Sequence, residues 1–190
     1  MGIKANSHFE GYFFNGLDYG ASVYYSIYEN YIVAIIDPSL DKKYMPMAQP
    51  TQVKRFINLD QAYKTGFEVF AQLDFLQDFS FKTELSYVYA KNKDLDESLP
   101  LTPPLVSRFN LRFEKERIWV RATYTLTSKQ SDIAPSFGES ETDGYGIVDL
   151  SFGAKPFEHF TVGVAASNIF DVAYHNHLNF SFVNQADYGR

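Results

Sequence analysis

Two histidines separated by a single residue are the first groups in this sequence that could do chemistry. His175 and His177 lie in the stretch SNIFDVAYHNHLNF, residues 167–180. In an extended chain such a pair points to one side, so two imidazole nitrogens could bind the same metal ion. The alternative is a pair of loop histidines that pack and form hydrogen bonds. The residue types alone name no particular metal.

Two methionines form a second pair of candidate ligands. Met45 and Met47 flank Pro46 in a segment that separates two runs of alternating residues. Thioether sulfurs suit soft metal ions such as Cu(I). The alternative is two methionines packed around a proline turn. Together with His175 and His177, they define a copper hypothesis in which the four side chains bind a ligand or its metal.

The rest of the sequence argues against other kinds of chemistry. The chain of 190 residues has no cysteine, which excludes disulfides, thiolate zinc sites and cysteine nucleophiles. It contains no Gly-x-Ser-x-Gly, His-Glu-x-x-His or phosphate-loop motif. We therefore expect neither an enzyme nor a resident cofactor. The net charge of −6 also argues against a nucleic-acid partner, because proteins that bind the phosphate backbone are basic.

The elements that must position these groups alternate between apolar and polar residues. In the run 65–75, Phe67 and Val69 lie on one side of an extended chain while Glu68 and Gln72 lie on the other. The same period of two predicts eight strands, at residues 3–13, 18–27, 65–75, 79–89, 108–113, 118–126, 148–153 and 160–167. No amphipathic helix is expected, and no apolar run approaches the ~18 residues of a membrane helix.

The connections between these strands alternate in length. Short connections are expected at Asn15–Gly16, Leu76–Asp78, Glu114–Arg117 and Lys155–His159. Long connections are expected at residues 37–54, 91–104, 128–144 and 169–190. Because neighbouring strands are antiparallel, all short turns then lie at one end and all long loops at the other. This is typical of outer-membrane barrels, which have short periplasmic turns and longer extracellular loops.

Charges and tyrosines favour a barrel in a membrane. Charged residues lie in mid-strand on the polar side, where a watery lumen could hydrate them: Glu68, Asp74, Lys82, Glu84, Arg108, Arg112 and Arg121. Tyrosines gather toward strand ends, as an interfacial aromatic girdle would require: Tyr24, Tyr25, Tyr28, Tyr31, Tyr87, Tyr89, Tyr124 and Tyr145. Two alternatives stay open, a small complete outer-membrane barrel acting as an adhesin or structural protein, and a soluble β-sandwich binding module.

Four motifs, in order, resemble TonB-dependent outer-membrane receptors. They are the stretch NLDQAYKTGFE (58–68), the proline-marked LPLTPP (99–104), Gly144–Tyr145 with Asp149–Leu150, and ASNIFD (166–171) followed by Tyr174. The last is similar to a sequence that marks the penultimate strand of such receptors. Together the motifs cover most of residues 55–180, and the first 54 residues fit as two further strands.

The resemblance implies an all-β, antiparallel transmembrane segment of a larger barrel, with about 22 strands filled by a plug. Residues 1–190 would be a C-terminal portion of that barrel, without the plug and the last strand. The implied function is active transport across the Gram-negative outer membrane of a scarce ligand, of the ferric siderophore type. The implied partners are outer-membrane lipid, the ligand itself and the TonB complex, which supplies energy through the plug.

Overall fold

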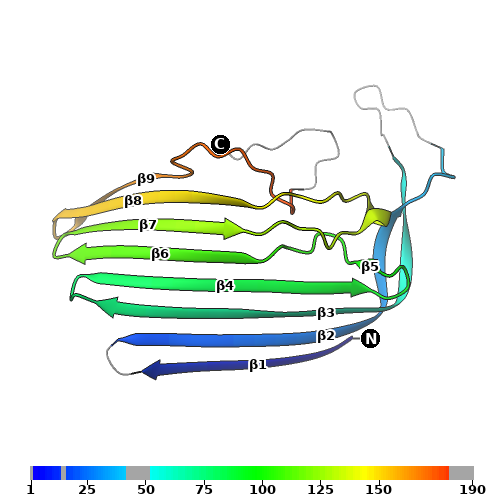
Figure 1. Cartoon of the computed structure of the whole chain (residues 1–190), viewed down its shortest axis with the longest axis horizontal. Helices are drawn as coiled ribbons and strands as arrows, with labels where there is room; N and C mark the ends of the chain where they lie inside the picture. Colours follow the sequence, from blue (N-terminus) through cyan, green and yellow to red (C-terminus); the bar gives the residue numbers. More distant parts are fainter. Residues whose placement is uncertain (1, 14–15, 42–51, 180–190) are drawn as a thin grey trace.

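The strands of the chain form one antiparallel sheet (Figure 1). The computed structural model describes residues 2–13, 16–41 and 52–179. Its elements are β1 (Gly2–Phe13), β2 (Leu17–Ile36), β3 (Lys54–Phe75), β4 (Phe79–Asn92), β5 (Glu97–Ser98), β6 (Val106–Lys115), β7 (Ile118–Thr127), η1 (Pro135–Phe137), β8 (Tyr145–Phe157) and β9 (Phe160–Ala166). Within these described residues, no helix is long and apolar enough to cross a membrane.

The sheet is an up-and-down meander that does not close on itself. Its strands follow in the order β1-β2-β3-β4-β6-β7-β8-β9, so that β1 and β9 form its two edges. All eight predicted strands are present. The ninth strand, β5, has two residues that pair with the end of β4, and it was missed because two residues are too few to show alternation.

Turns and loops separate to opposite ends of the sheet, as the connection lengths predicted. Short turns join the strands at the left of Figure 1, and the long connections lie at the right. Left-handed backbone conformations close the tight turns, with φ of +77° at Gly16, +50° at Leu76 and +49° at Glu116. Asn15, the first half of the predicted Asn-Gly turn, lies outside the described residues.

One face of the sheet is an apolar belt. The register pairs Val23 with Phe67, Phe67 with Tyr87, and Val120 with Phe152, so apolar side chains of successive strands share this face. Many of its large apolar residues are exposed in the chain by itself, among them Val23, Val69, Leu73, Leu111, Val120, Leu126, Leu150 and Val164. Such a continuous exposed belt is typical of the outer surface of a transmembrane barrel wall.

Aromatic rings border this belt at both ends. Toward the loops, the ring centroids of Tyr25 and Tyr63 lie 6.1 Å apart, and toward the turns those of Phe75 and Phe79 lie 5.7 Å apart. From Tyr63 to Phe75 the strand covers roughly 40 Å at ~3.3 Å per residue. A tilt of ~40° reduces this to about 30 Å along the membrane normal, close to the thickness of a bilayer core.

The opposite face is polar, and its charges pair with one another. Lys82 Nζ lies 2.8 Å from Glu84 Oε1, and Arg112 lies 2.5 Å from Glu114. Glu84 also accepts a hydrogen bond from Asn110 Nδ2 at 3.4 Å. This face corresponds to the predicted lumen side.

Several predicted girdle tyrosines lie on the lumen face, among them Tyr145, which shares the register of Asp149, and Tyr24 and Tyr28. Tyr24 pairs with Asn6 on one side and Gly66 on the other, and Tyr28 lies opposite Ala62, so both belong to the lumen register. Sequence position alone does not show the face of a tyrosine near a strand end, because the pairing register decides it.

Beyond the sheet, β2 and β3 continue as a bent arm, and the alternation changes sides at the bend (Figure 1). Asn30 adopts a φ of +56° there. Beyond Asn30 the buried apolar residues are Val33 and Leu59, whereas their neighbours Ile32 and Phe56 are 63% and 78% exposed. Val33 and Leu59 join Ala62, Ala90 and Leu99 in the buried apolar cluster from which the loops rise.

Candidate ligand-binding loops

Two long connections at the loop end are tied to each other by backbone hydrogen bonds, and the side chain of His177 joins the third to them. Ser128 N donates to Leu105 O at 2.9 Å, and Ser98 N donates to Ile133 O at 3.2 Å. Gln130 and Thr142 exchange two N–H···O bonds of 2.9 and 3.1 Å, which closes the loop between β7 and β8 on itself. We call residues 93–105, 128–144 and 167–179 together the loop block. Its parts are held as a single packed unit.

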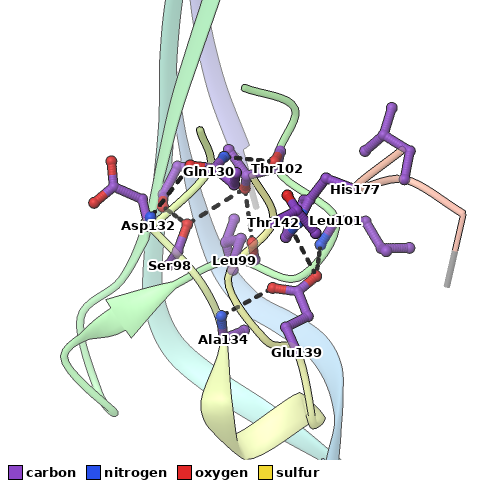
Figure 2. A network of polar contacts seen from close by, with 12 residues as sticks. Ser98, Leu99, Leu101, Thr102, Gln130, Asp132, Ala134, Glu139, Thr142 and His177 are labelled. Atoms are coloured by element: carbon purple, nitrogen blue, oxygen red, sulfur yellow. Dashed lines mark hydrogen bonds and ion pairs between the residues drawn. The ribbon is translucent and has the colours of Figure 1, made fainter. Parts of the chain in front are cut away.

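Buried Glu139 connects two of these loops. Its Oε1 accepts the N–H of Leu101 at 2.5 Å, and its Oε2 accepts the N–H of Ala134 at 2.9 Å (Figure 2). The short helical turn η1 ends at Gly138, whose φ of +95° lets the chain turn so that Glu139 follows directly. A carboxylate that accepts backbone N–H groups stabilises a loop strongly, because both its oxygens are satisfied away from water.

Gln130 forms a second buried connection. Its Nε2 donates to Thr102 O at 2.8 Å, and its Oε1 accepts the N–H of Asp132 at 3.2 Å. Thr102 in turn donates its hydroxyl to Leu99 O at 2.7 Å. Figure 2 shows these contacts beside the Glu139 contacts, so the proline-rich segment 99–104 is fixed from the loop between β7 and β8.

His177 packs into this network. Its ring is buried, with Nδ1 3.2 Å from the Thr142 hydroxyl and Nε2 3.8 Å from Glu139 Oε1. Burial lowers the pKa of the imidazole below its ordinary value, the Glu139 carboxylate opposes this shift, and neighbouring His175 adds to it. Nδ1 thus has a hydrogen-bond partner, whereas Nε2 is buried without one, at ion-pair distance from the Glu139 carboxylate.

His175 has different surroundings. It is half-buried and lines an open pocket of about 360 Å³ with Ser140, Glu141, Thr142, Asp143, Gly144, Tyr145, Ala173 and Tyr174. Within residues 2–13, 16–41 and 52–179, no three His, Cys, Asp or Glu side chains lie close enough together to hold a metal ion. Met45 and Met47 lie outside these residues. Of the four predicted ligand residues, the structure thus places only His175 and His177, one at a pocket and one in the loop block.

The sequence motifs at the end of β9 become physical contacts. The rings of Tyr145 and Tyr174 stack with 4.2 Å between centroids. Asp149 Oδ1 accepts the N–H of Asn168 at 2.7 Å, and the Asn168 side chain bonds both the N–H and the carbonyl of Val172. Asp149 and Asn168 therefore end β9 and direct the following chain back over β8, where Tyr174 meets Tyr145.

Gly144, the first residue of that motif, is required by a close approach of the backbone. A Cβ at this position would lie 2.8 Å from both Thr127 O and Lys129 N. Only glycine fits there without a shift of the neighbouring loop.

The sequence analysis did not identify Glu139 and Gln130, the residues that hold the loop block together. A weak signal was available, because Pro135 and Gly138 bracket a short helical turn directly before Glu139. The partners of Glu139, however, lie up to 38 residues away in the sequence.

Comparison with known proteins agrees with this geometry. The family model described as "TonB dependent receptor-like, beta-barrel" matches residues 2–169. No curated protein matches the chain significantly by sequence. The match to the family model thus covers every strand of the sheet.

Several solved structures share the fold. The copper transporter OprC superposes with a TM-score of 0.80 at 21% identity, over 93% of this chain and 26% of that one. A mutant of the ferric enterobactin receptor PfeA from Pseudomonas aeruginosa gives 0.70 at 20% identity, over 93% and 26%. The FrpB iron transporter from Neisseria meningitidis gives 0.70 at 14% identity, over 96% and 29%. The chain thus spans between a quarter and a third of the length of these structures.

These similarities concern the strands, which form the wall of a barrel. The meander of β1 to β9, the apolar belt and the separation of turns from loops are found in one chain whose sequence matches the family model from the first strand to the last. On these grounds the chain belongs to the TonB-dependent receptors, a family of proteins of the Gram-negative outer membrane.

Proposed function

We propose that this chain forms part of the barrel wall of an outer-membrane receptor that takes up a scarce metal-bearing ligand, of the ferric siderophore type, with energy supplied by TonB. The observation that carries the proposal is the family match over residues 2–169. Two relatives of the same fold are described as a ferric enterobactin receptor and an iron transporter. The same proposal places the protein in the Gram-negative outer membrane.

Each part of this chain has a distinct task in such a receptor. The apolar belt anchors the wall in lipid, and the paired charges of the opposite face stay hydrated in the lumen. The loop block presents a preformed surface to the medium, because Glu139 and Gln130 fix its backbone through buried hydrogen bonds. A preformed surface binds a ligand without a large loss of conformational entropy.

The experiment is an uptake assay with the full-length gene product in a Gram-negative strain that lacks its own siderophore receptors. Cells that express the protein should accumulate radiolabelled iron from at least one ferric siderophore, and deletion of TonB should abolish accumulation but leave surface binding intact. Failure to accumulate iron from a broad siderophore panel would contradict the iron proposal. Accumulation that continues without TonB would contradict the proposed energy source.

Copper is a second candidate ligand. His175 lines an open pocket at the loop end, and one relative of the same fold is described as a copper transporter. His175, His177, Met45 and Met47 are the proposed ligand residues. Cu(I) titration of the full-length protein should give a larger dissociation constant for His175→Ala, and for the Met45→Leu, Met47→Leu double variant, than for the wild type. Unchanged copper binding in both would end this candidate.

A further inference from the structure

The outer face of the wall carries a group of tyrosines and lysines where the strands approach the loops. Tyr25, Tyr63 and Tyr89 come from three neighbouring strands, with ring centroids of successive pairs 6.1 and 6.0 Å apart. Lys91 lies directly opposite Tyr63 in the ladder, and Lys93 Nζ lies 5.7 Å from the Tyr63 ring centroid. We call these five residues the tyrosine–lysine patch.

The position of the patch relative to the apolar belt is defined by the strand register. Immediately toward the turns, the same face carries Phe67 and Tyr87, with ring centroids 5.9 Å apart, followed by Val69 and Leu85. Immediately toward the loops, β4 ends at Asn92 and the exposed residues 93–96 begin. The patch therefore lies at the level where a lipid headgroup would meet the protein, with acyl-chain surface below it.

The two lysines of the patch have different partners. Lys93 Nζ donates to Gln61 Oε1 at 2.8 Å, which is a neutral partner. Lys91 Nζ donates to the backbone carbonyl of Asp96 at 2.9 Å and lies 2.6 Å from Asp96 Oδ1. The Asp96 side chain is 91% exposed, and an ion pair in water is weak, so an anion can compete for this ammonium group.

The nearby carboxylate of Asp94 is engaged elsewhere, because it accepts the backbone N–H groups of Asp60 and Gln61 at 2.6 and 3.3 Å. Two ammonium groups and three phenols thus lie together on this face, where the carboxylate of the same strands is that of Glu29, directly opposite Gln61.

We propose that the tyrosine–lysine patch binds the phosphate group of an outer-leaflet lipid, whose acyl chains lie against the apolar belt. Ammonium groups donate charge-assisted hydrogen bonds to phosphate oxygens. The tyrosine rings provide amphipathic surface at the same level. The inference rests on the outer-membrane location within the proposed function, but it does not depend on which ligand the receptor transports.

The test measures lipid retention by the full-length protein in detergent, with native mass spectrometry as the readout. The probes are diphosphoryl lipid A, the same lipid after removal of its phosphates, and inorganic phosphate alone. The test protein is the Lys91→Met, Lys93→Met double variant. Lys64→Met is the matched control, because Lys64 follows Tyr63 but lies on the lumen face, opposite Ser26. Heat-induced unfolding confirms that every variant is folded.

We expect wild type and Lys64→Met to retain diphosphoryl lipid A equally, and the double variant to retain it at least five-fold more weakly, since basic residues near an anionic lipid surface add to binding. Dephosphorylated lipid should bind the wild type as weakly as the double variant. Equal retention by wild type and double variant would overturn the proposal. So would inorganic phosphate that binds as tightly as the lipid, since this would indicate a site for free phosphate.

Fractionation and uptake assays run beside this test separate the two proposals. A protein found outside the outer membrane would remove the basis of both. A protein in the outer membrane that transports its ligand but shows no lysine-dependent lipid binding would overturn only the lipid inference.

Discussion

The ring of Tyr174 stacks on the ring of Tyr145 with 4.2 Å between centroids and 26° between ring planes. These residues are separated by the whole of β8 and β9, and Asn168 with Asp149 brings them together. The stack fixes the chain after β9 against the first residue of β8, which places His175 at its pocket and His177 in the loop block.

Replacement of Tyr174 by alanine should therefore loosen residues 172–179 without unfolding the wall. An aromatic pair contributes roughly 0.5–1.5 kcal/mol beyond its buried area, so amide exchange in this segment should accelerate by about three- to ten-fold. Hydrogen-exchange mass spectrometry on the full-length protein measures this. Tyr174→Phe keeps the ring and is the control. Equal protection in the alanine and phenylalanine variants would show that the stack does not hold the segment.

Glu139→Gln should weaken the loop block more than the equivalent change at Glu141. A hydrogen bond to a charged group contributes about 1.5–3 kcal/mol, and Glu139 accepts two backbone N–H groups. Glu141 forms an exposed ion pair with Lys129, a type of contact that contributes about 1 kcal/mol or less. Limited proteolysis of residues 93–105 and 128–144 measures the difference. Indistinguishable digestion of the two variants would contradict the role given to Glu139.

The loop block should loosen in acid because of His177. Its folded-state pKa lies below the ordinary value of 6.5, so near and below pH 6.5 the unfolded loop binds more protons than the folded one. Stability of the block is thus fully present above pH 6.5 and falls as the pH drops toward the folded-state pKa.

Protease susceptibility of the loops measured from pH 8 down to pH 5 tests this dependence. His177→Gln, which cannot titrate, should flatten the profile, whereas His8→Gln on the lumen face of β1 should leave it as in the wild type. A profile that is unchanged in His177→Gln would assign the acid effect to another group.

A lysine on the apolar belt should destabilise insertion, whereas a lysine on the opposite face should not. Val69→Lys places a charge in lipid, which costs about 2–4 kcal/mol near the bilayer midplane. Ser22→Lys places the same group on the lumen face, directly opposite Glu68. Urea titration of the full-length protein folded into phospholipid vesicles compares the two. Equal destabilisation by both substitutions would mean that Val69 does not face lipid.

The alternation of apolar and polar residues predicted most of the fold, for a physical reason. A strand between lipid and water must present one kind of residue to each side, so the run from Thr65 to Phe75 shows its conformation in its own sequence. The two residues of β5 face no such division, since they pair with β4 in the loop region. Nothing local marks them as a strand.

The sequence predicted where the long loops lie, but not which residues hold them together. Two of the four family-like motifs contain Tyr145, Asp149, Asn168 and Tyr174, and the structure joins these residues in pairs across the two motifs. Glu139 escaped notice because its partners, Leu101 and Ala134, offer backbone N–H groups that no side-chain pattern reveals. The roles of His175 and His177 as ligands stay predictions, since spacing shows that two imidazoles could meet but not which partners each one finds.

The left-handed conformation of Asn30 divides β2 and β3 into two lengths with opposite phase. On the turn side of Asn30, the apolar side chains of the outward register form the exposed belt. On the loop side of Asn30, Val33 and Leu59 are buried in the apolar cluster beneath the loops. A single residue inserted or deleted between Tyr28 and Asn30 would therefore leave the membrane-spanning strands intact but exchange the buried and exposed faces of the arm. The number of residues in β2 before Asn30, more than their hydrophobicity, sets the level at which the apolar side chains pass from the exposed belt to the buried cluster.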